Sequence, residues 1–384
     1  MKIIYIFRSL AVWGGIERIL VDKMNYLSEM SGMEVYMLTS DQGTHPITYM
    51  LNEKVKVEDL NICFYHQYKY GLLRRILVRR QMIIRYEQLL ANRIRNIRPD
   101  IIVCTTADMI SCIVKVKGAI PLVVESHSIC NRTINYGRNN IQKAINRFLF
   151  LRSINKADVV VTLTQGDAEE WKKYHPFVVV IPNMVHLRRE TILSSTSKKV
   201  IFVGRFDYQK RVQEAIRIWS LIRPKYPDWV LDIYGEGELQ KDIEDDAKRV
   251  GGISVYPPTT FIFDCYQKSS ILISTSLFEP FGLVIPEAMS CGLPVVAYDC
   301  QYGPADIISD GVDGFLIKQD DINAFVEKLS MLMSSMEMRK RMGDLGIQSA
   351  HRFEASQIMP LWQNLFQQLN HKNYKKTNKK CVGL

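Results

Sequence analysis

The segment 279–294 combines residue types that could bind a phosphorylated sugar. Its Pro280 is typical of a loop, and the residues after Leu283 are typical of a short helix. The backbone amides of Phe281, Gly282 and Leu283 would then be free at the start of that helix. Free amides and the helix dipole together form a site for an anion such as a diphosphate.

Two carboxylates accompany this predicted anion site, with Glu279 before the helix and Glu287 on it. A carboxylate repels a phosphate, so these two side chains would serve another purpose. They are suited to accept hydrogen bonds from vicinal hydroxyls of a sugar or a ribose. The alternative is that Glu287 is a solvated helix acid and Glu279 a helix cap. The neighbouring Pro-Phe-Gly and Cys-Gly-Leu-Pro sequences favour the binding site.

A second group of candidate residues lies in the basic loop 204–211, directly after a predicted strand. Gly204 allows the chain to turn, and Arg205 and Lys210 would emerge at the carboxyl end of that strand. Cationic side chains there could hold a diphosphate and neutralise charge on a leaving nucleotide. A solvated basic loop without function is the alternative.

Two weaker signals lie in the first half of the chain. Gly14 and Gly15 precede a helical pattern and would let the backbone approach a ligand closely. His127 stands at the end of a predicted strand, where it could orient a sugar or act as acid or base, although a lone histidine is more often structural. Neither Gly14-Gly15 nor Gly235-Glu236-Gly237 has the third glycine of a dinucleotide fingerprint, which disfavours a nicotinamide site.

The elements that would position these residues are short apolar runs alternating with helical patterns. Runs that are apolar throughout are typical of parallel strands buried on both faces. Two such series predict two α/β, doubly wound domains. The predicted strands are Lys2–Phe7, Glu34–Thr39, Asp100–Thr105, Pro121–Glu125, Asp158–Thr164, Phe177–Ile181, Lys199–Val203, Trp229–Tyr234, Ile271–Thr275, Pro294–Tyr298 and Gly314–Ile317.

Net charge is distributed unevenly over these domains. Of the total of +10, residues 1–182 carry +9, residues 183–370 carry −4 and residues 371–384 carry +5.

A predicted helix from Leu72 to Arg98 would align five arginines on one face, with Leu73, Ile76, Leu77, Ile83, Ile84, Leu90, Ile94 and Ile97 on the other. This pattern favours docking on an anionic membrane surface or a lipid diphosphate. A core-packed helix with a solvated basic face is the alternative. The five arginines are Arg74, Arg75, Arg79, Arg85 and Arg93.

Several function classes have no support in the sequence. No apolar run reaches the roughly 18 residues of a membrane span. No Walker loop, zincin motif or cysteine pair at metal-binding spacing occurs, so we expect no metal ligands. The eight cysteines are expected to be free thiols in a reducing compartment. No nucleic-acid-binding module is evident.

Taken together, these segments resemble glycosyltransferase family 4, the retaining nucleotide-sugar transferases of GT-B fold, with the likeness greatest to bacterial capsule, O-antigen and exopolysaccharide enzymes. The resemblance covers nearly the whole chain. The segments that carry it are Gly14-Gly15-Ile16-Glu17, Ile181-Pro182-Asn183, Gly204-Arg205 with Gln209-Lys210, the E-x(7)-E pair Glu279 and Glu287, Gly303-Pro304 after Asp299, and Arg352-Phe353 with Ile358 and Trp362.

The resemblance implies a domain plan in which two Rossmann-like domains face a central cleft. Residues 1–182 would form the acceptor-binding domain, 183–198 a linker and 199–352 the nucleotide-sugar-binding domain. Residues 353–370 would form a helix crossing back to the first domain, followed by the basic tail 371–384.

The resemblance also implies roles for the candidate residues. Arg205 and Lys210 would stabilise the diphosphate leaving group, Glu279 would bind the donor sugar and Glu287 the ribose. Gly15 and the amides of Phe281, Gly282 and Leu283 would cradle phosphate and sugar, and His127 would lie near the donor sugar. No cofactor or metal is implied, because cations and a helix N-terminus replace the metal.

The sequence departs from the family pattern at three places. Arg211 stands where glycine is common, and Tyr256-Pro257-Pro258-Thr259 replaces a glycine-containing turn near the base. Ser128 follows His127 where an aspartate or asparagine is frequent.

From these features we expect a cytoplasmic hexosyltransferase, peripheral on the inner face of the cell membrane. It would move a sugar from a nucleotide donor, UDP by preference, to a hydroxyl of a lipid-linked glycan in bacterial surface polysaccharide synthesis. The alternatives are a nucleotide-sugar epimerase of the same fold and a non-catalytic protein that binds anions or membranes.

Overall fold

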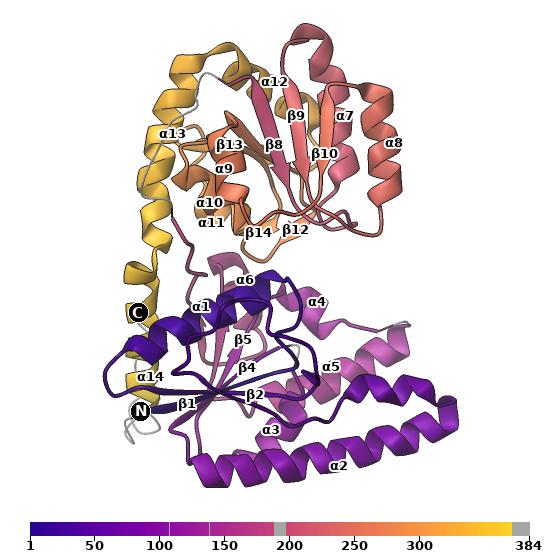
Figure 1. Cartoon of the computed structure of the whole chain (residues 1–384), viewed down its shortest axis with the longest axis vertical. Coiled ribbons are helices and arrows are strands. Elements are labelled where there is room, and N and C mark those ends of the chain that lie inside the picture. The colour runs from indigo at the N-terminus through magenta and orange to yellow at the C-terminus, as the bar shows by residue number, and fades with distance from the viewer. Residues whose placement is uncertain (107, 138, 188–196, 371–384) are drawn as a thin grey trace. The chain divides into compact units, whose positions relative to one another are not determined.

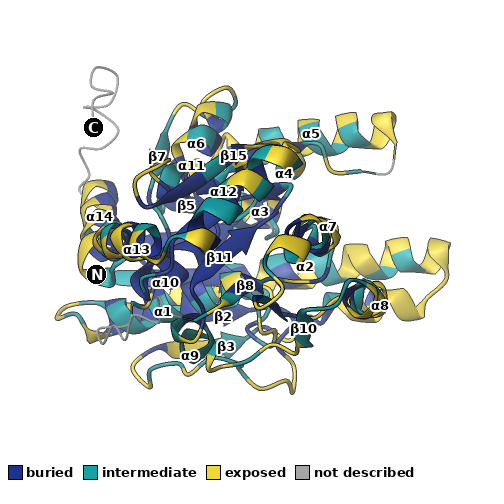
Figure 2. Ribbon diagram, turned by 90° about the horizontal axis from the view of Figure 1, so that it is seen from above, coloured by how far each residue is buried: buried dark blue, intermediate teal, exposed yellow. Residues whose placement is uncertain are grey.

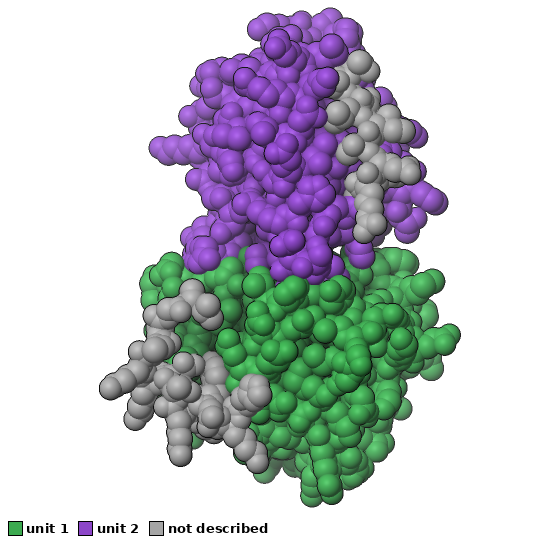
Figure 3. All heavy atoms as spheres, turned by 90° about the vertical axis from the view of Figure 1, so that its left-hand side faces the viewer, with its two compact units in different colours: residues 1–163, 168–181, 359–384 green, residues 164–167, 182–358 purple. Residues whose placement is uncertain are grey.

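The computed structural model describes residues 1–106, 108–137, 139–187 and 197–370. These residues form two compact units, coloured separately in Figure 3. Unit 1 comprises Met1–Leu163, Ala168–Ile181 and the described residues from Met359 onwards, and unit 2 comprises Thr164–Asp167 and Pro182–Ile358. The predicted basic tail 371–384 and most of the predicted linker, 188–196, lie outside the described residues.

Unit 1 is built on a seven-stranded parallel sheet with the order β3-β2-β1-β4-β5-β6-β7 (Figure 1). Alternate residues of each strand face opposite sides, so the sheet has two apolar faces. One face packs against α2, α3 and the end of α5. Unit 1 contains β1 (Lys2–Phe7), α1 (Gly15–Glu29), β2 (Glu34–Thr39), β3 (Lys56–Asp59), the 3-10 helix η1 (Phe64–Lys69), α2 (Leu72–Ile97), β4 (Ile101–Thr105), α3 (Ile110–Val116), β5 (Leu122–Glu125), α4 (Cys130–Ile134), α5 (Asn140–Ile154), β6 (Val159–Thr162), most of α6 (Gln165–Trp171) and β7 (Val178–Val180).

Unit 2 is built on a six-stranded parallel sheet with the order β10-β9-β8-β11-β13-β15, plus a two-stranded pairing of β12 with β14. It contains β8 (Lys199–Val203), α7 (Val212–Ile222), η2 (Arg223–Lys225), β9 (Val230–Tyr234), α8 (Gln240–Val250), β10 (Ile253–Tyr256), α9 (Ile262–Gln267), β11 (Ile271–Ser274), β12 (Phe278–Glu279), α10 (Val284–Ser290), β13 (Val295–Asp299), β14 (Gln301–Tyr302), α11 (Gly303–Ile307), β15 (Gly314–Lys318), α12 (Ile322–Ser334), α13 (Met336–Ala350) and η3 (His351–Phe353). The last helix, α14 (Ala355–Asn370), begins in unit 2 and continues into unit 1 from Met359.

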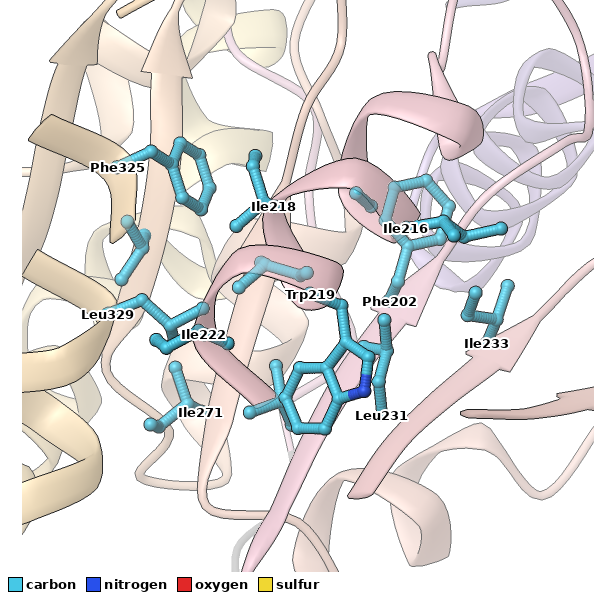
Figure 4. Packing of buried hydrophobic residues seen from close by; sticks show 14 of the residues in the cluster. Phe202, Ile216, Ile218, Trp219, Ile222, Leu231, Ile233, Ile271, Phe325 and Leu329 are labelled. Carbon is cyan, nitrogen blue, oxygen red and sulfur yellow. The ribbon is translucent and has the colours of Figure 1, made fainter. Parts of the chain in front are cut away.

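The core of unit 2 follows from the amphipathic pattern of its helices. Trp219 and Ile222 of α7, Phe325 of α12, Phe202 of β8 and Leu231 of β9 belong to one buried cluster, in which Trp219 lies beside Leu231 (Figure 4). All five side chains are almost fully buried. Burying such large side chains contributes roughly 1.5–3 kcal/mol each to folding.

The predicted α/β, doubly wound class is confirmed, and all eleven predicted strands are present within one or two residues at each end. The prediction missed β3, β10, β12 and β14. β3 has the sequence Lys-Val-Glu-Asp at an exposed edge, and β10 is an edge strand that is only half-buried. Neither needs the continuous apolar run that marks a central parallel strand.

The predicted long helix is confirmed as α2, but its two halves differ. Its only buried residues are Tyr86, Leu90 and Ile94, all in the second half. The alternative of a core-packed helix with a solvated basic face is therefore wrong for the first half, where Leu73 and Ile76 are exposed. The second half packs because it alone lies against the sheet core.

Two loops of unit 2 pack backbone against backbone where they leave β8 and β9. A Cβ atom on Gly235, which has φ +159°, would lie 1.9 Å from the carbonyl oxygen of Gly204. The amide of Phe206 donates to the carbonyl of Glu236 at 2.8 Å. The Gly235-Glu236-Gly237 sequence therefore serves close packing of the loop after β8.

We expect Gly235→Ala to destabilise unit 2 severely, because the new methyl group has to displace backbone. The matched control is Gly311→Ala, which has φ +74° but no atom within 4 Å of the added methyl, so only the backbone strain of about 1 kcal/mol applies. Urea denaturation of both variants measures the difference. Equal midpoints for the two variants would contradict the packing interpretation.

Candidate functional site

The candidate site of unit 2 lies at the point where the strand order of its sheet reverses. β8 and β11 are neighbours there, while β9 and β13 continue the sheet in opposite directions. Loops that follow such strands diverge and leave room for a ligand at the carboxyl edge. The two segments that carry the strongest sequence signals, 204–211 and 275–283, are these loops.

Lys210 and Glu279, one from each loop, form an ion pair between Nζ and Oε2. Both side chains are largely buried, with exposed fractions of 14% and 10%. Ser276 donates a further hydrogen bond to the same Oε2 at 3.2 Å. Sequence analysis predicted both residues for one site, and the structure brings them into direct contact.

Gln209 joins the same two loops through the backbone. Its carbonyl accepts from the amide of Leu277 at 2.8 Å, and its side-chain amide donates to the carbonyl of Phe278 at 3.2 Å. Gln209 also accepts from the guanidinium of Arg205 at 3.1 Å, and Arg205 lies 3.0 Å from Asp207. The Arg205 side chain is 69% exposed, so its charge remains accessible to an anion.

The loop after β8 enters α7 through Arg211, which adopts a left-handed conformation with φ +49°. This conformation explains why glycine suits the position. The arginine is held there by an ion pair with Asp320 at 2.6 Å, and Thr275 donates to its carbonyl at 2.9 Å. Although Arg211 departs from the family pattern, these contacts within unit 2 hold the loop in the conformation that glycine would favour.

The start of α10 lies against Glu279, as the sequence predicts. Gly282 has φ +94°, and a Cβ atom there would lie 2.9 Å from Cγ of Glu279. In the part of the chain that the structure describes, we find no hydrogen bond donated by the amides of Phe281, Gly282 or Leu283. Gly303 lets a second loop contact this turn, because a Cβ there would lie 1.9 Å from the carbonyl oxygen of Phe281.

Glu287 lies on α10 and is 3% exposed, so it is not a solvated helix acid. Tyr266, fully buried on α9, donates a hydrogen bond from its hydroxyl to Oε2 of Glu287 at 3.2 Å. No sequence pattern marks Tyr266 as a site residue. The alternative role of Glu279 as a helix cap is also wrong, since the N-cap of α10 is Leu283, which has no side-chain cap.

A cavity of about 570 Å³ lies beside the loops that follow β9 and β10. Tyr256 stacks on Tyr234 at its edge, with ring centroids 4.8 Å apart. The cavity is lined by Gly235, Glu236, Gly237, Gln240, Glu244, Val255, Tyr256 and Pro257. Tyr256 and Pro257 belong to the segment that departs from the family pattern, so that segment forms one wall of the cavity.

Unit 1 contains a buried polar cluster centred on Glu125, the last residue of β5. Lys23 of α1 forms an ion pair with Oε2 of Glu125, and Nε2 of His127 lies 2.9 Å from the same oxygen. The exposed fractions of all three side chains are 4% or less. Trp362 of α14 covers the ammonium of Lys23 at 4.2 Å from the ring centroid, a cation–π contact.

Burial acts against both charges of this pair. Burial lowers the pKa of Lys23, although the carboxylate of Glu125 partly offsets the effect. Burial also raises the pKa of Glu125, but the charge of Lys23 and the hydrogen bond of His127 outweigh it and bring the pKa to about 2. Glu125 therefore stays ionised at neutral pH and fixes the ring of His127, the predicted candidate.

The predicted glycine loop precedes α1, with Gly14 as N-cap and Gly15 as first residue. Glu17 folds back over this helix start, because a Cβ atom on Gly14 would lie 2.1 Å from Oε2 of Glu17. Burial raises the pKa of Glu17, while a hydrogen bond to its own backbone amide and the charge of His127 oppose the shift. The carboxylate of Glu17 thus lies beside the backbone of Gly14 and Gly15, which sequence analysis assigned to a ligand.

Sequence reasoning missed three charged residues at the carboxyl edge of the unit 1 sheet. Arg8 follows β1 and lies 3.6 Å from Asp41, which follows β2. Asp108 follows β4 and accepts from the amide and the hydroxyl of Thr105 at 2.7 and 2.9 Å. Burial raises the pKa of Asp108 to about 7, against the hydrogen bonds of Thr105 and the charge of Arg8. Each of these three residues closely follows a predicted strand, and this position is the sequence signal that could have revealed them.

Comparison with known proteins identifies the family. Residues 13–189 match the family described as "Glycosyltransferase Family 4", and residues 186–349 match "Glycosyl transferases group 1". The two matches adjoin and together span most of the chain. The chain belongs to these glycosyltransferases. The predicted family and GT-B fold are thereby confirmed.

Individual glycosyltransferases agree with this assignment. The amylovoran biosynthesis glycosyltransferase AmsD of Erwinia amylovora is 27% identical over 54% of this chain and 62% of its own. An α-1,4-N-acetyl-D-galactosaminyltransferase of Campylobacter jejuni, named for an acceptor on undecaprenyl diphosphate, is 24% identical over 97% of this chain and 99% of its own. The chain spans less than two thirds of the length of several curated relatives that it matches.

Among solved structures, TarM superimposes with a TM-score of 0.79 over 95% of this chain and 98% of its own, at 16% identity. A complex of a Staphylococcus aureus TarM variant with fondaparinux, α-GlcNAc-glycerol and UDP gives a TM-score of 0.76 over 95% and 99% of the two chains, at 15% identity. At this identity the similarity concerns the fold of the glycosyltransferase.

None of the helices in the described ranges is long and apolar enough to cross a membrane. Within the same ranges, no group of three or more His, Cys, Asp and Glu residues is arranged to hold a metal ion. The seven cysteines that the structure describes are free thiols.

We expect Lys23→Met to destabilise unit 1 by about 3–5 kcal/mol, because Glu125 would remain buried without its counter-charge. The double variant Lys23→Met with Glu125→Gln should recover much of that loss. Lys56→Met, which breaks the exposed ion pair with Glu34, is the matched control and should change little. Urea denaturation measures all three, and a Lys23 effect as small as that of Lys56 would contradict the buried pair.

Asp108 should make stability depend on pH. Its folded pKa of about 7 lies above its ordinary value of 3.8, so the folded state holds the proton more tightly. Stability should therefore fall as pH rises from about 4 to 7, by at most about 1.4 kcal/mol per pH unit. Asp108→Asn should remove this slope in urea titrations across that range. An unchanged slope would show that Asp108 titrates normally.

Proposed function

We propose that this glycosyltransferase moves a hexose from a UDP-sugar to a hydroxyl of a lipid-linked glycan, with retention of configuration and without a metal or other cofactor. The observation that carries the proposal is the contact of Lys210 with Glu279 beside the start of α10. It brings a cation from the loop after β8 into contact with a carboxylate that can accept hydrogen bonds from sugar hydroxyls, beside the backbone amides at the start of α10. A diphosphate and the sugar it carries require these three types of group together.

The proposed reaction assigns each group one task. The bond between the anomeric carbon and the diphosphate breaks, while the acceptor oxygen bonds to the same face of that carbon. The acceptor proton passes to the leaving phosphate, so no protein nucleophile is needed. Lys210 and Arg205 stabilise the charge that develops on the diphosphate, together with the amides of Phe281, Gly282 and Leu283.

Glu279 and Glu287 act on hydroxyl groups in this proposal. Oε2 of Glu279 accepts hydrogen bonds from Lys210 and Ser276, and in this proposal these bonds orient the carboxylate toward the sugar. Glu287 binds the ribose and is oriented by Tyr266. The cavity beside Tyr256 and Pro257 would accommodate the base. In unit 1, the proposal assigns Gly15 to the phosphate and sugar of the donor and His127, which is held by Glu125, to the donor sugar.

The choice of UDP and of the acceptor is supported by relatives. UDP is present in the TarM complex, and the name of the Campylobacter enzyme specifies an acceptor on undecaprenyl diphosphate. An acceptor of that kind, in bacterial surface polysaccharide synthesis, requires work at the inner face of the cell membrane. We therefore propose peripheral attachment there, aided by the basic face of α2.

Calorimetric titration with UDP in EDTA, with GDP as the control nucleotide, tests the donor site. We expect binding of UDP and not of GDP. Lys210→Ala should weaken UDP binding by roughly 10- to 150-fold, the equivalent of one charge-assisted hydrogen bond, and Glu287→Ala should also weaken it. Lys225→Ala, an exposed lysine of unit 2, is the control and should bind as the wild type does.

The same variants test catalysis. Lys210→Ala and Glu287→Ala should both lose most transfer while still folding, with lower melting temperatures, because Glu279 loses its counter-charge in the first variant and the buried hydroxyl of Tyr266 loses its acceptor in the second. Glu279→Gln should keep UDP binding but lose transfer, because its task is on the sugar. Full transfer by Lys210→Ala and Glu287→Ala would disprove the site, and GDP binding would change the donor. Conversion of the donor without any acceptor would favour the epimerase instead.

A further inference from the structure

The largest group of exposed apolar side chains in unit 1 lies on the first half of α2 and on α5. Both segments project from the same side of unit 1, and both are mostly exposed (Figures 1 and 2). Leu73, with 82% exposure, is the extreme example on α2, and Ile141, with 75%, on α5. The remaining exposed apolar members are Leu72, Ile76, Leu77 and Ile84 on α2 and Ile145, Phe148 and Leu149 on α5. We call these nine side chains the apolar surface.

The apolar surface is not a fragment of the core. No residue of α2 before Tyr86 is buried, and the only buried residue of α5 is Ile154 at its end. On α5 the exposed apolar residues are spaced at 141, 145, 148 and 149, which places them on one helical face. Patches of this kind on a folded protein mark a binding surface.

The charge around the apolar surface is positive. Arg74, Arg79, Arg80 and Arg85 of α2 are exposed, as is Arg152 of α5. From residue 67 to 98 the only acid is Glu87, and from 132 to 156 there is none. Arg93, predicted to join this basic face, instead forms an ion pair with Glu58 at 2.5 Å, so it belongs to the packed half of α2.

Aromatic side chains support the arginines at the start of α2. The guanidinium of Arg74 lies 4.8 Å from the ring of Tyr70, and that of Arg75 lies 4.4 Å from the ring of Tyr68. Tyr68 is itself 65% exposed. Arginine and tyrosine are amphipathic, and such pairs are typical of the zone between lipid headgroups and acyl chains.

We propose that the first half of α2 and α5 insert the apolar surface into the interface of an anionic bilayer, with the surrounding arginines on the headgroups. The positive charge around the apolar surface favours an anionic bilayer over other partners. A second copy would present the same cations to each other, which disfavours self-association through this surface. Nucleic acid would satisfy the cations but would leave aliphatic side chains such as Leu73 in water.

Insertion differs from adsorption through arginines alone. Purely electrostatic binding weakens steeply as salt screens the charges. Inserted leucine, isoleucine and phenylalanine side chains add a term that depends on apolar area and not on salt. The proposal extends the attachment given in the proposed function, but it does not depend on the donor chemistry.

Flotation of the full-length protein with vesicles tests the proposal. We expect binding to vesicles of phosphatidylcholine with 30% phosphatidylglycerol, weak binding to phosphatidylcholine alone, and partial retention of binding when NaCl is raised from 0.1 to about 0.5 M. Two variants remove apolar side chains: Leu72→Ser with Leu73→Ser, Ile76→Ser and Leu77→Ser, and Ile145→Ser with Phe148→Ser and Leu149→Ser. Each should lower the vesicle partition coefficient at least about 10-fold, since each removes several exposed apolar groups.

The matched control carries Leu221→Ser and Val312→Ser, two comparably exposed apolar residues of unit 2, and should bind as the wild type does. Wild-type binding by both serine variants, or complete loss of wild-type binding at high salt, would overturn insertion. A dimer in sedimentation equilibrium that the serine variants dissociate would assign the surface to a second copy. UDP titration of each variant separates the two proposals, because vesicle binding without UDP binding leaves this inference standing and disproves only the donor site.

Discussion

The order of the strands in the unit 2 sheet is what brings Lys210 and Glu279 close enough to form their ion pair. Each residue lies in a loop, and loops of these lengths could take many conformations. The reversal of strand order between β8 and β11 brings the two loop starts side by side. Gln209 and Thr275 then tie the loops together through the backbone. With the two loops fixed, the ammonium and the carboxylate can be buried together, which neither could be alone.

Unit 1 uses the same sheet topology for a different arrangement. Its order also reverses, between β1 and β4, and Arg8 and Asp108 follow those two strands. Here the charged groups face one another: Arg8 faces Asp41, Lys23 faces Glu125, and Glu17 lies on its own helix start. Unit 1 thus pairs these charged side chains with one another, although Oε1 of Glu125 has no hydrogen-bond partner among the described residues. Unit 2 leaves the amides before α10 without a partner among those residues.

Most of the fold could be predicted from sequence, because a central parallel strand must be apolar throughout. The strands β1, β4, β8 and β11 are apolar apart from one residue at an end, and each was recognised. The edge strand β3, with the sequence Lys-Val-Glu-Asp, does not have it and was missed. The candidate site followed from local signals, namely glycines, prolines and charges just after strands. Contacts between distant segments had no such signal, so the roles of Tyr266 at Glu287 and of Trp362 at Lys23 emerged only from the structure.

The path of α14 has a consequence for biosynthesis. The helix begins in unit 2, and from Met359 it completes unit 1, where Trp362 covers the ammonium of Lys23. A nascent chain is released from its N-terminus onwards, and unit 2 lies between the strands of unit 1 and Trp362 in the sequence. Until translation has passed unit 2, Lys23 therefore lacks the aromatic ring that covers its ammonium. Synthesis of α14 is thus the step that completes the fold of unit 1.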